Sequence, residues 1–113
     1  MKTIAVKDLV ERFSLEVLAG SNQLHVPIPK TRVNRPGLEF VGYFDFFPHA
    51  HVQVLGSKEI NYLHKLSEEE RNLHIGNIVK YHPPCFVVTR NQDGLKYLKK
   101  YCDEEGIPLL RSP

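Results

Sequence analysis

The sequence lacks any long hydrophobic run, and this absence limits the class of protein that it encodes. No stretch of the 113 residues approaches the roughly 20 consecutive apolar residues that a membrane-spanning helix needs. Residues 1–13 carry charged side chains at positions 7, 8, 11 and 12, so they lack the uninterrupted apolar segment of a signal peptide. We therefore expect a soluble protein that stays in the cytoplasm and has no membrane partner.

A large excess of charge of one sign is also missing. The 15 lysine and arginine residues nearly balance 13 aspartate and glutamate residues, and the formal net charge is +2 with neutral histidines. Lys99 and Lys100 form the only adjacent basic pair. Domains that bind nucleic acid usually concentrate basic residues on one surface. The sequence therefore predicts no nucleic-acid partner.

Cysteine is scarce, and tryptophan is absent. Cys85 lies in an apolar run and Cys102 lies on a helical pattern, which is typical of reduced thiols that pack in a core. The remaining composition is ordinary, with 42% hydrophobic and 25% charged residues and no low-complexity tract. A chain of this length is expected to form one ordered domain over residues 1–113.

Apolar periodicity predicts the elements of the N-terminal third. Four apolar residues at positions 6, 9, 10 and 13 share one face of a helix over residues 6–13. Alternation over residues 15–19 predicts a short strand that ends at Gly20. Residues 21–35 contain two prolines, which cannot donate to a central ladder, so this segment is expected to be irregular or at a sheet edge.

The rest of the chain alternates strand and helix patterns. The expected strands are residues 52–55, 85–88 and 107–110, and the run at 85–88 has the continuous apolar character of a strand covered on both faces. One helix is expected after Ser57 as its cap, another from the Ser67 and Glu70 capping box towards Val79, and a third from Asp93 to Gly106. Alternating strands and helices predict an α/β fold of three layers, with a mainly parallel sheet and helical crossovers.

No phosphate-binding loop is recognisable. Gly37 and Gly42 have the required glycine spacing, but Tyr43 and Phe44 stand where a lysine and a hydroxyl residue belong. Residues 56–58 combine glycine, serine and lysine in the wrong order and without the upstream glycine. We therefore expect this segment to hold no nucleotide cofactor.

The six histidines do not form a recognisable metal site either. His49 with His51, and His82 with Cys85, are the only close pairs of ligand-capable side chains, whereas a structural zinc site needs about four ligands. The apolar surroundings of Cys85 disfavour a thiolate nucleophile. We expect neither a metal nor a catalytic residue in the chain.

Residues 34–56 are dense in aromatic and turn residues, and two interpretations are open. In one, Phe40, Phe44 and Phe47 fill the core while nearby glycines permit tight turns. In the other, the segment forms a contact surface for a partner. The candidate contact residues are then Arg35, Tyr43, Asp45 and His51.

Several motifs along the chain resemble the N-terminal domain of the bacterial HPr kinase/phosphorylase family. The motifs are Asn34-Arg35-Pro36-Gly37-Leu38-Glu39, Gly42-Tyr43-Phe44, Val52-Gln53-Val54-Leu55-Gly56 with Glu59, and Gly106-Ile107-Pro108-Leu109-Leu110-Arg111. The resemblance extends over essentially the whole chain. This chain departs from the family at Asn34, where serine is common, at the pair 46–47, where tyrosines are usual, and at His51, where arginine is usual.

The resemblance implies that the chain is the noncatalytic N-terminal domain of a bifunctional enzyme, with a role in assembly or regulation. Enzymes of this family use ATP and magnesium to phosphorylate a serine of the carrier protein HPr, and they reverse the step by phosphorolysis. They control the sugar phosphotransferase system and carbon catabolite repression. Their phosphate loop lies in a C-terminal catalytic domain, absent from this chain, through which they engage HPr.

The resemblance also implies assembly with copies of itself, since the family forms hexamers, and a fold similar to the amino-terminal domain of Mur ligases. The alternative is a stand-alone module that binds a small anion or metabolite at a helix N-terminus near Ser57.

Overall fold

The computed structural model describes residues 4–28, 33–37, 50–89 and 96–113. The helices are α1 (Val6–Phe13), α2 (Ser57–Lys65), α3 (Glu68–Val79) and α4 (Lys96–Glu105), with one 3-10 turn at Ser21–Gln23. The strands are β1 (Ile4–Ala5), β2 (Glu16–Ala19), β3 (Pro27–Ile28), β4 (Val33–Asn34), β5 (Val52–Leu55), β6 (Phe86–Val88) and β7 (Leu109–Arg111).

The described strands form a mixed, mostly parallel sheet of five strands in the order β2-β7-β6-β5-β4. Strands β4, β5, β6 and β7 run parallel to one another, and β2 is antiparallel to β7. Helices α2 and α3 connect β5 to β6, and α4 lies between β6 and β7 in the chain. The α/β fold with helical crossovers between parallel strands is therefore confirmed.

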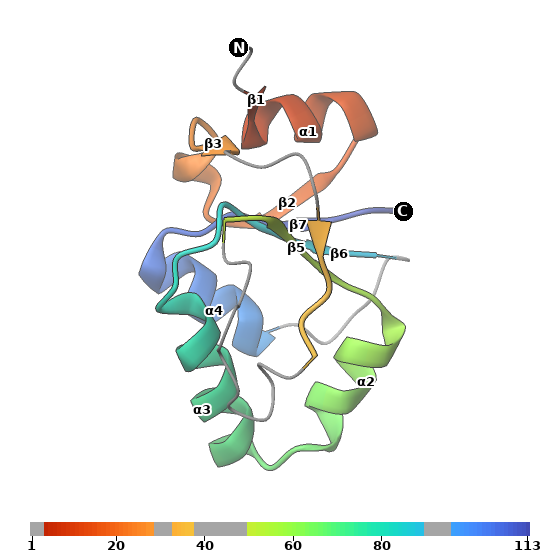
Figure 1. Cartoon of the computed structure of the whole chain (residues 1–113), viewed down its shortest axis with the longest axis vertical. Coiled ribbons are helices and arrows are strands. Elements are labelled where there is room, and N and C mark those ends of the chain that lie inside the picture. The colour runs from red at the N-terminus through yellow and green to blue at the C-terminus, as the bar shows by residue number, and fades with distance from the viewer. Residues whose placement is uncertain (1–3, 29–32, 38–49, 90–95) are drawn as a thin grey trace.

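Helices cover both faces of the sheet (Figure 1). Helices α2, α3 and α4 lie on one face, where Leu55, Phe86 and Val88 pack in the larger core cluster. Helix α1 lies on the other face with the small β1–β3 ribbon, and Val6 packs there in the second cluster. Residues 85–88 contribute to both clusters, which confirms the prediction of a strand covered on both faces.

The helix boundaries follow the predicted signals with one exception. The Ser67 hydroxyl accepts a hydrogen bond from the Glu70 amide at 3.1 Å, and Gly106 adopts the left-handed conformation (φ 68°) expected after α4. The prediction that Ser57 caps α2 is wrong, because Gly56 occupies the cap position. The Glu59 carboxylate accepts from the Gly56 amide at 2.7 Å and so satisfies that end of the helix. The predicted cap of the next helix, Asp93, lies outside the described residues.

The predicted edge structure over residues 21–35 includes β4, which forms the edge of the described sheet beside β5. Asn34 pairs with Gln53, whose side chain is fully buried, and the Asn34 side chain donates from Nδ2 to Oε1 of the Gln53 side chain at 2.7 Å. The Gln53 side chain donates from Nε2 to the His51 backbone carbonyl at 2.9 Å. A one-residue slip of β4 would remove the Asn34 partner of this buried side chain, so the Asn34–Gln53 pair favours the observed register of β4.

The first and last strands of the sheet are neighbours. Glu16 of β2 pairs with Arg111 of β7, and the Arg111 guanidinium donates to both Glu16 carboxylate oxygens at 2.9 and 3.0 Å. The Ser112 amide donates to the Val88 carbonyl at 2.9 Å, so β7 is bound on both sides. Strand β7 is therefore an inner strand of the sheet.

The interpretation that Phe40, Phe44 and Phe47 fill the core concerns residues outside the described part of the chain. None of the described helices combines the length and the apolar character needed to cross a membrane.

Candidate functional site

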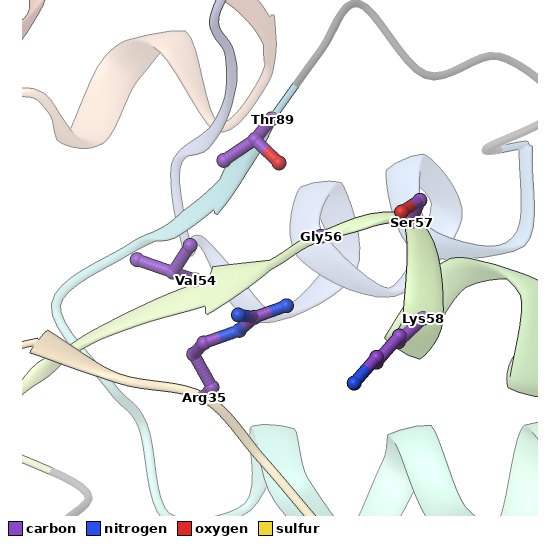
Figure 2. Close-up of a pocket in the computed structure, with 6 residues that line it drawn as sticks. All are labelled: Arg35, Val54, Gly56, Ser57, Lys58 and Thr89. Carbon is purple, nitrogen blue, oxygen red and sulfur yellow. The ribbon is translucent and has the colours of Figure 1, made fainter.

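A pocket of about 320 Å³ lies where parallel strands β4, β5 and β6 end (Figure 2). Its lining residues come from the ends of those strands and from the start of α2: Arg35, Val54, Gly56, Ser57, Lys58 and Thr89. The carboxyl ends of parallel strands are the usual place for ligands in α/β folds. Among the described lining residues, the polar side chains are two cations and two hydroxyls, and none is a carboxylate.

Arg35 is held at the pocket by Glu59. Its guanidinium donates to the Glu59 carboxylate from Nε at 3.2 Å and from Nη2 at 2.9 and 3.3 Å. The same carboxylate accepts from the Gly56 amide, so Glu59 joins the end of β4 to the start of α2. The Arg35 side chain remains 57% exposed, whereas that of Glu59 is 12% exposed. The pair therefore presents its cation to solvent and keeps its anion covered.

Gly56 permits this approach of Arg35. A Cβ atom at residue 56 would lie 2.7 Å from Nη2 of Arg35 and 3.3 Å from Oε1 of Glu59. Figure 2 shows the Arg35 side chain extending from the end of β4 towards Gly56. A side chain at position 56 would therefore clash with the Arg35 guanidinium where it now lies.

The described lining residues offer positive charge and hydrogen-bond donors. Among the residues that the structure describes, no cluster of three or more His, Cys, Asp or Glu side chains could hold a metal. Both cysteines are free and fully buried, and burial raises the pKa of Cys85 and of Cys102 to about 12. Their burial confirms that they pack in the core, and both thiols are protonated at neutral pH.

Comparison with protein families places these residues in context. The family model described as the HPr serine kinase N terminus matches residues 4–113. The chain belongs to the HPr serine kinase N-terminal family. The resemblance drawn from the sequence motifs is thereby confirmed.

Curated relatives in this family are longer proteins. A protein of Oceanobacillus iheyensis with the provisional name HPr kinase/phosphorylase 2 is 65% identical over 112 residues, which cover 99% of this chain and 37% of that protein. The HPr kinase/phosphorylase of Bacillus cytotoxicus is 38% identical over 112 residues, 99% of this chain and 36% of its own length. The chain thus spans about a third of the length of the relatives that it matches.

A solved structure shares the fold at low sequence identity. It contains the CBS and DRTGG domains of the regulatory region of a Clostridium perfringens pyrophosphatase, complexed with the activator diadenosine tetraphosphate. The match has a TM-score of 0.60 and 11% identity, and it covers 96% of this chain and 41% of the other. At this identity the likeness concerns the fold alone.

The structure places two of the four candidate contact residues of this family member. Arg35 lines the pocket, and His51 lies in a bend before β5, at the opposite end of that strand from Gly56. The structure therefore does not bring Arg35 and His51 together. Tyr43 and Asp45 lie outside the described residues.

Glu59 is the residue at this site whose role the sequence patterns did not reveal. The available signal was an acidic residue three positions after Gly56, because a carboxylate at the third helical position often accepts from the cap amide. Its ion pair with Arg35 spans 24 positions and has no local signal in the sequence. Of the pairs considered as metal ligands, His82 is exposed while Cys85 is buried in the core, and His49 lies outside the described residues.

Proposed function

We propose that this chain is the noncatalytic N-terminal domain of a bifunctional bacterial HPr serine kinase/phosphorylase and that it serves assembly or regulation. The single observation that carries this proposal is the 65% identity to the Oceanobacillus iheyensis relative over 99% of the chain. The parent enzyme phosphorylates a serine of HPr and reverses that reaction in the cytoplasm, and so controls the sugar phosphotransferase system and carbon catabolite repression.

Catalysis belongs to a C-terminal domain of the same protein in this proposal. That domain holds ATP and magnesium and binds HPr, while residues 1–113 form one domain without a cofactor. The absence of a phosphate-loop motif from the sequence supports this division of labour. The mostly parallel sheet with helical crossovers is compatible with the likeness to Mur ligase amino-terminal domains that the family resemblance implies.

Assembly is the role for which we propose specific residues. Arg35, Tyr43, Asp45 and His51 are the proposed contacts with another copy, in a family expected to form hexamers, or with the catalytic domain. The exposure of the Arg35 guanidinium supports its availability to such a partner. A stand-alone binding module is not favoured, because the curated relatives carry this segment within a chain nearly three times as long.

The catalytic part of the proposal is tested by comparing the 113-residue chain with a fusion. In the fusion, the chain replaces the matching segment of the Bacillus cytotoxicus relative, and both proteins are assayed for ATP-dependent phosphorylation of the HPr serine. We expect turnover by the fusion and none above background by the chain alone. Turnover by the isolated chain would refute the noncatalytic assignment.

The assembly part is tested in the same fusion by light scattering. Arg35→Ala removes the proposed contact and also releases Glu59, whereas Glu59→Gln weakens the ion pair but leaves the guanidinium on the surface. We expect Arg35→Ala to reduce the oligomer and Glu59→Gln to leave its size unchanged. An unchanged oligomer in Arg35→Ala would remove Arg35 from the interface.

A further inference from the structure

We infer that the pocket at the ends of β4, β5 and β6 binds a small oxyanion, either a phosphate or a carboxylate group. The inference goes beyond the proposed function and does not depend on it, because it concerns binding to this chain alone. It rests on the cavity and on the charges and donors of its lining residues.

The two cations of the lining are not neutralised equally. Arg35 directs Nε and Nη2 at Glu59, and Nη1 makes no hydrogen bond within the described part of the chain. The two N–H groups of Nη1 are therefore available for an acceptor other than Glu59. Glu59 therefore orients the guanidinium at the pocket lining and leaves Nη1 as a charged donor for an oxyanion.

Lys58 is the second cation of the lining, and Glu59, which pairs with Arg35, does not neutralise it. It lies in the first turn of α2, where the partial positive charge of the helix end disfavours a cation. No acidic side chain of the described residues lies in ion-pair contact with it, and it is exposed. A residue that breaks a local rule of stability without a compensating contact often serves a site. An anion in the pocket would supply the missing partner.

Hydroxyl donors come from two further positions. Ser57 opens α2, and Thr89 follows β6, where its amide donates to the Leu55 carbonyl at 3.1 Å and fixes its backbone beside the end of β5. Both residues line the cavity with Lys58 (Figure 2). Four polar side chains from three segments of the chain thus border one space of about 320 Å³, near the lower limit of ligand pockets. The size suits a single small anion or one anionic group of a larger ligand.

The experiment is a titration of the 15N-labelled 113-residue chain with sodium phosphate and, separately, with sodium acetate, followed by amide chemical shifts. Sodium chloride at the same ionic strength is the reference. We expect saturable shifts at residues 56–58 and 89 with one or both anions and none with chloride. Tighter binding of phosphate identifies a phosphoryl ligand, and tighter binding of acetate identifies a carboxylate ligand.

Variants decide whether the pocket is the site. Lys58→Gln is expected to weaken binding by about tenfold, the effect of losing one charge-assisted hydrogen bond. Lys80→Gln, an exposed lysine after α3, is expected to leave affinity unchanged. Thr89→Val tests the lining at a position without charge and should weaken binding as well.

Shifts that grow linearly with concentration, or that chloride reproduces, would overturn the inference, as would equal affinity in Lys58→Gln and Lys80→Gln. None of these results bears on phosphorylation by the fusion protein, so a failure here is distinguishable from a failure of the proposed function.

Discussion

Replacing Arg71 of α3 with alanine should destabilise the fold far more than replacing Arg12 of α1. The Arg71 guanidinium donates to the Leu63 carbonyl at 2.9 Å, to the Leu66 carbonyl at 3.2 Å and, at the limit of hydrogen bonding, to the His64 carbonyl at 3.5 Å. It also lies over the Tyr97 ring, with Cζ 4.7 Å from the ring centroid. One side chain therefore joins the end of α2, the start of α3 and α4.

The magnitude follows from these contacts. Each of the two shorter hydrogen bonds contributes about 1 kcal/mol net, or somewhat more because the donor is charged. The contact with the ring adds about 0.5–1 kcal/mol. Arg71→Ala should therefore lower the free energy of unfolding by about 2–4 kcal/mol. This is a large fraction of the roughly 5–15 kcal/mol that stabilises an ordinary domain.

Urea denaturation followed by circular dichroism measures this loss as a shift in midpoint at constant slope. Arg12→Ala is the matched control, because Arg12 is exposed in the last turn of α1, and its loss should change stability by less than about 0.5 kcal/mol. Arg71→Lys should recover only part of the loss, since an ammonium lacks the planar fork that reaches several carbonyls. A loss in Arg71→Ala no larger than that in Arg12→Ala would refute the reasoning.

Three further predictions concern glycines and thiols. Gly76→Ala should stabilise the protein by about 1 kcal/mol, because the residue is inside α3 and the nearest atom to an added Cβ lies 3.9 Å away. Gly20→Ala should lower the unfolding midpoint by an amount equivalent to about 2 kcal/mol or more, since its φ is 67° and an added Cβ would lie 2.4 Å from the Ile107 carbonyl oxygen; a neutral result would contradict that geometry. Burial raises the pKa of Cys85 and of Cys102 from 9.0 to about 12, so the unfolded chain releases these protons first. Stability should therefore be complete below pH 9 and decline as pH rises from about 9 towards 12, and both thiols should resist alkylation at pH 8 until denaturant is added.

Local patterns were sufficient for much of the fold because they report burial directly. Three of the four apolar positions of residues 6–13, and the continuous run around Phe86, become buried or partly buried, whereas Phe13 at the end of α1 is 58% exposed. The alternation of strands and helices after Val52 also determined that those strands run parallel, since such connections are long enough for a crossover.

Contacts between distant segments were not predictable in this way. The antiparallel pairing of β2 with β7 joins residues 95 positions apart, and no local periodicity specifies it. At the site, Arg35 was a candidate contact residue from the sequence and stays a prediction in that role, while its ion pair with Glu59 depends on where β4 lies beside α2. Serine is a common N-cap residue, so the sequence predicted Ser57 as the cap of α2. In the structure Gly56 is the cap, and its amide donates to the Glu59 carboxylate.

The position of β7 inside the sheet has a consequence for how the protein forms on the ribosome. In chain order β7 follows the other described strands of the sheet, and it separates β2 from β6. Until it emerges, β2 lacks its pairing partner among the described strands, and one edge of β6 stays unpaired. Completion of the sheet during translation must therefore wait for residues 109–111, so a nascent chain stalled before them would expose two unpaired edges to chaperones and proteases.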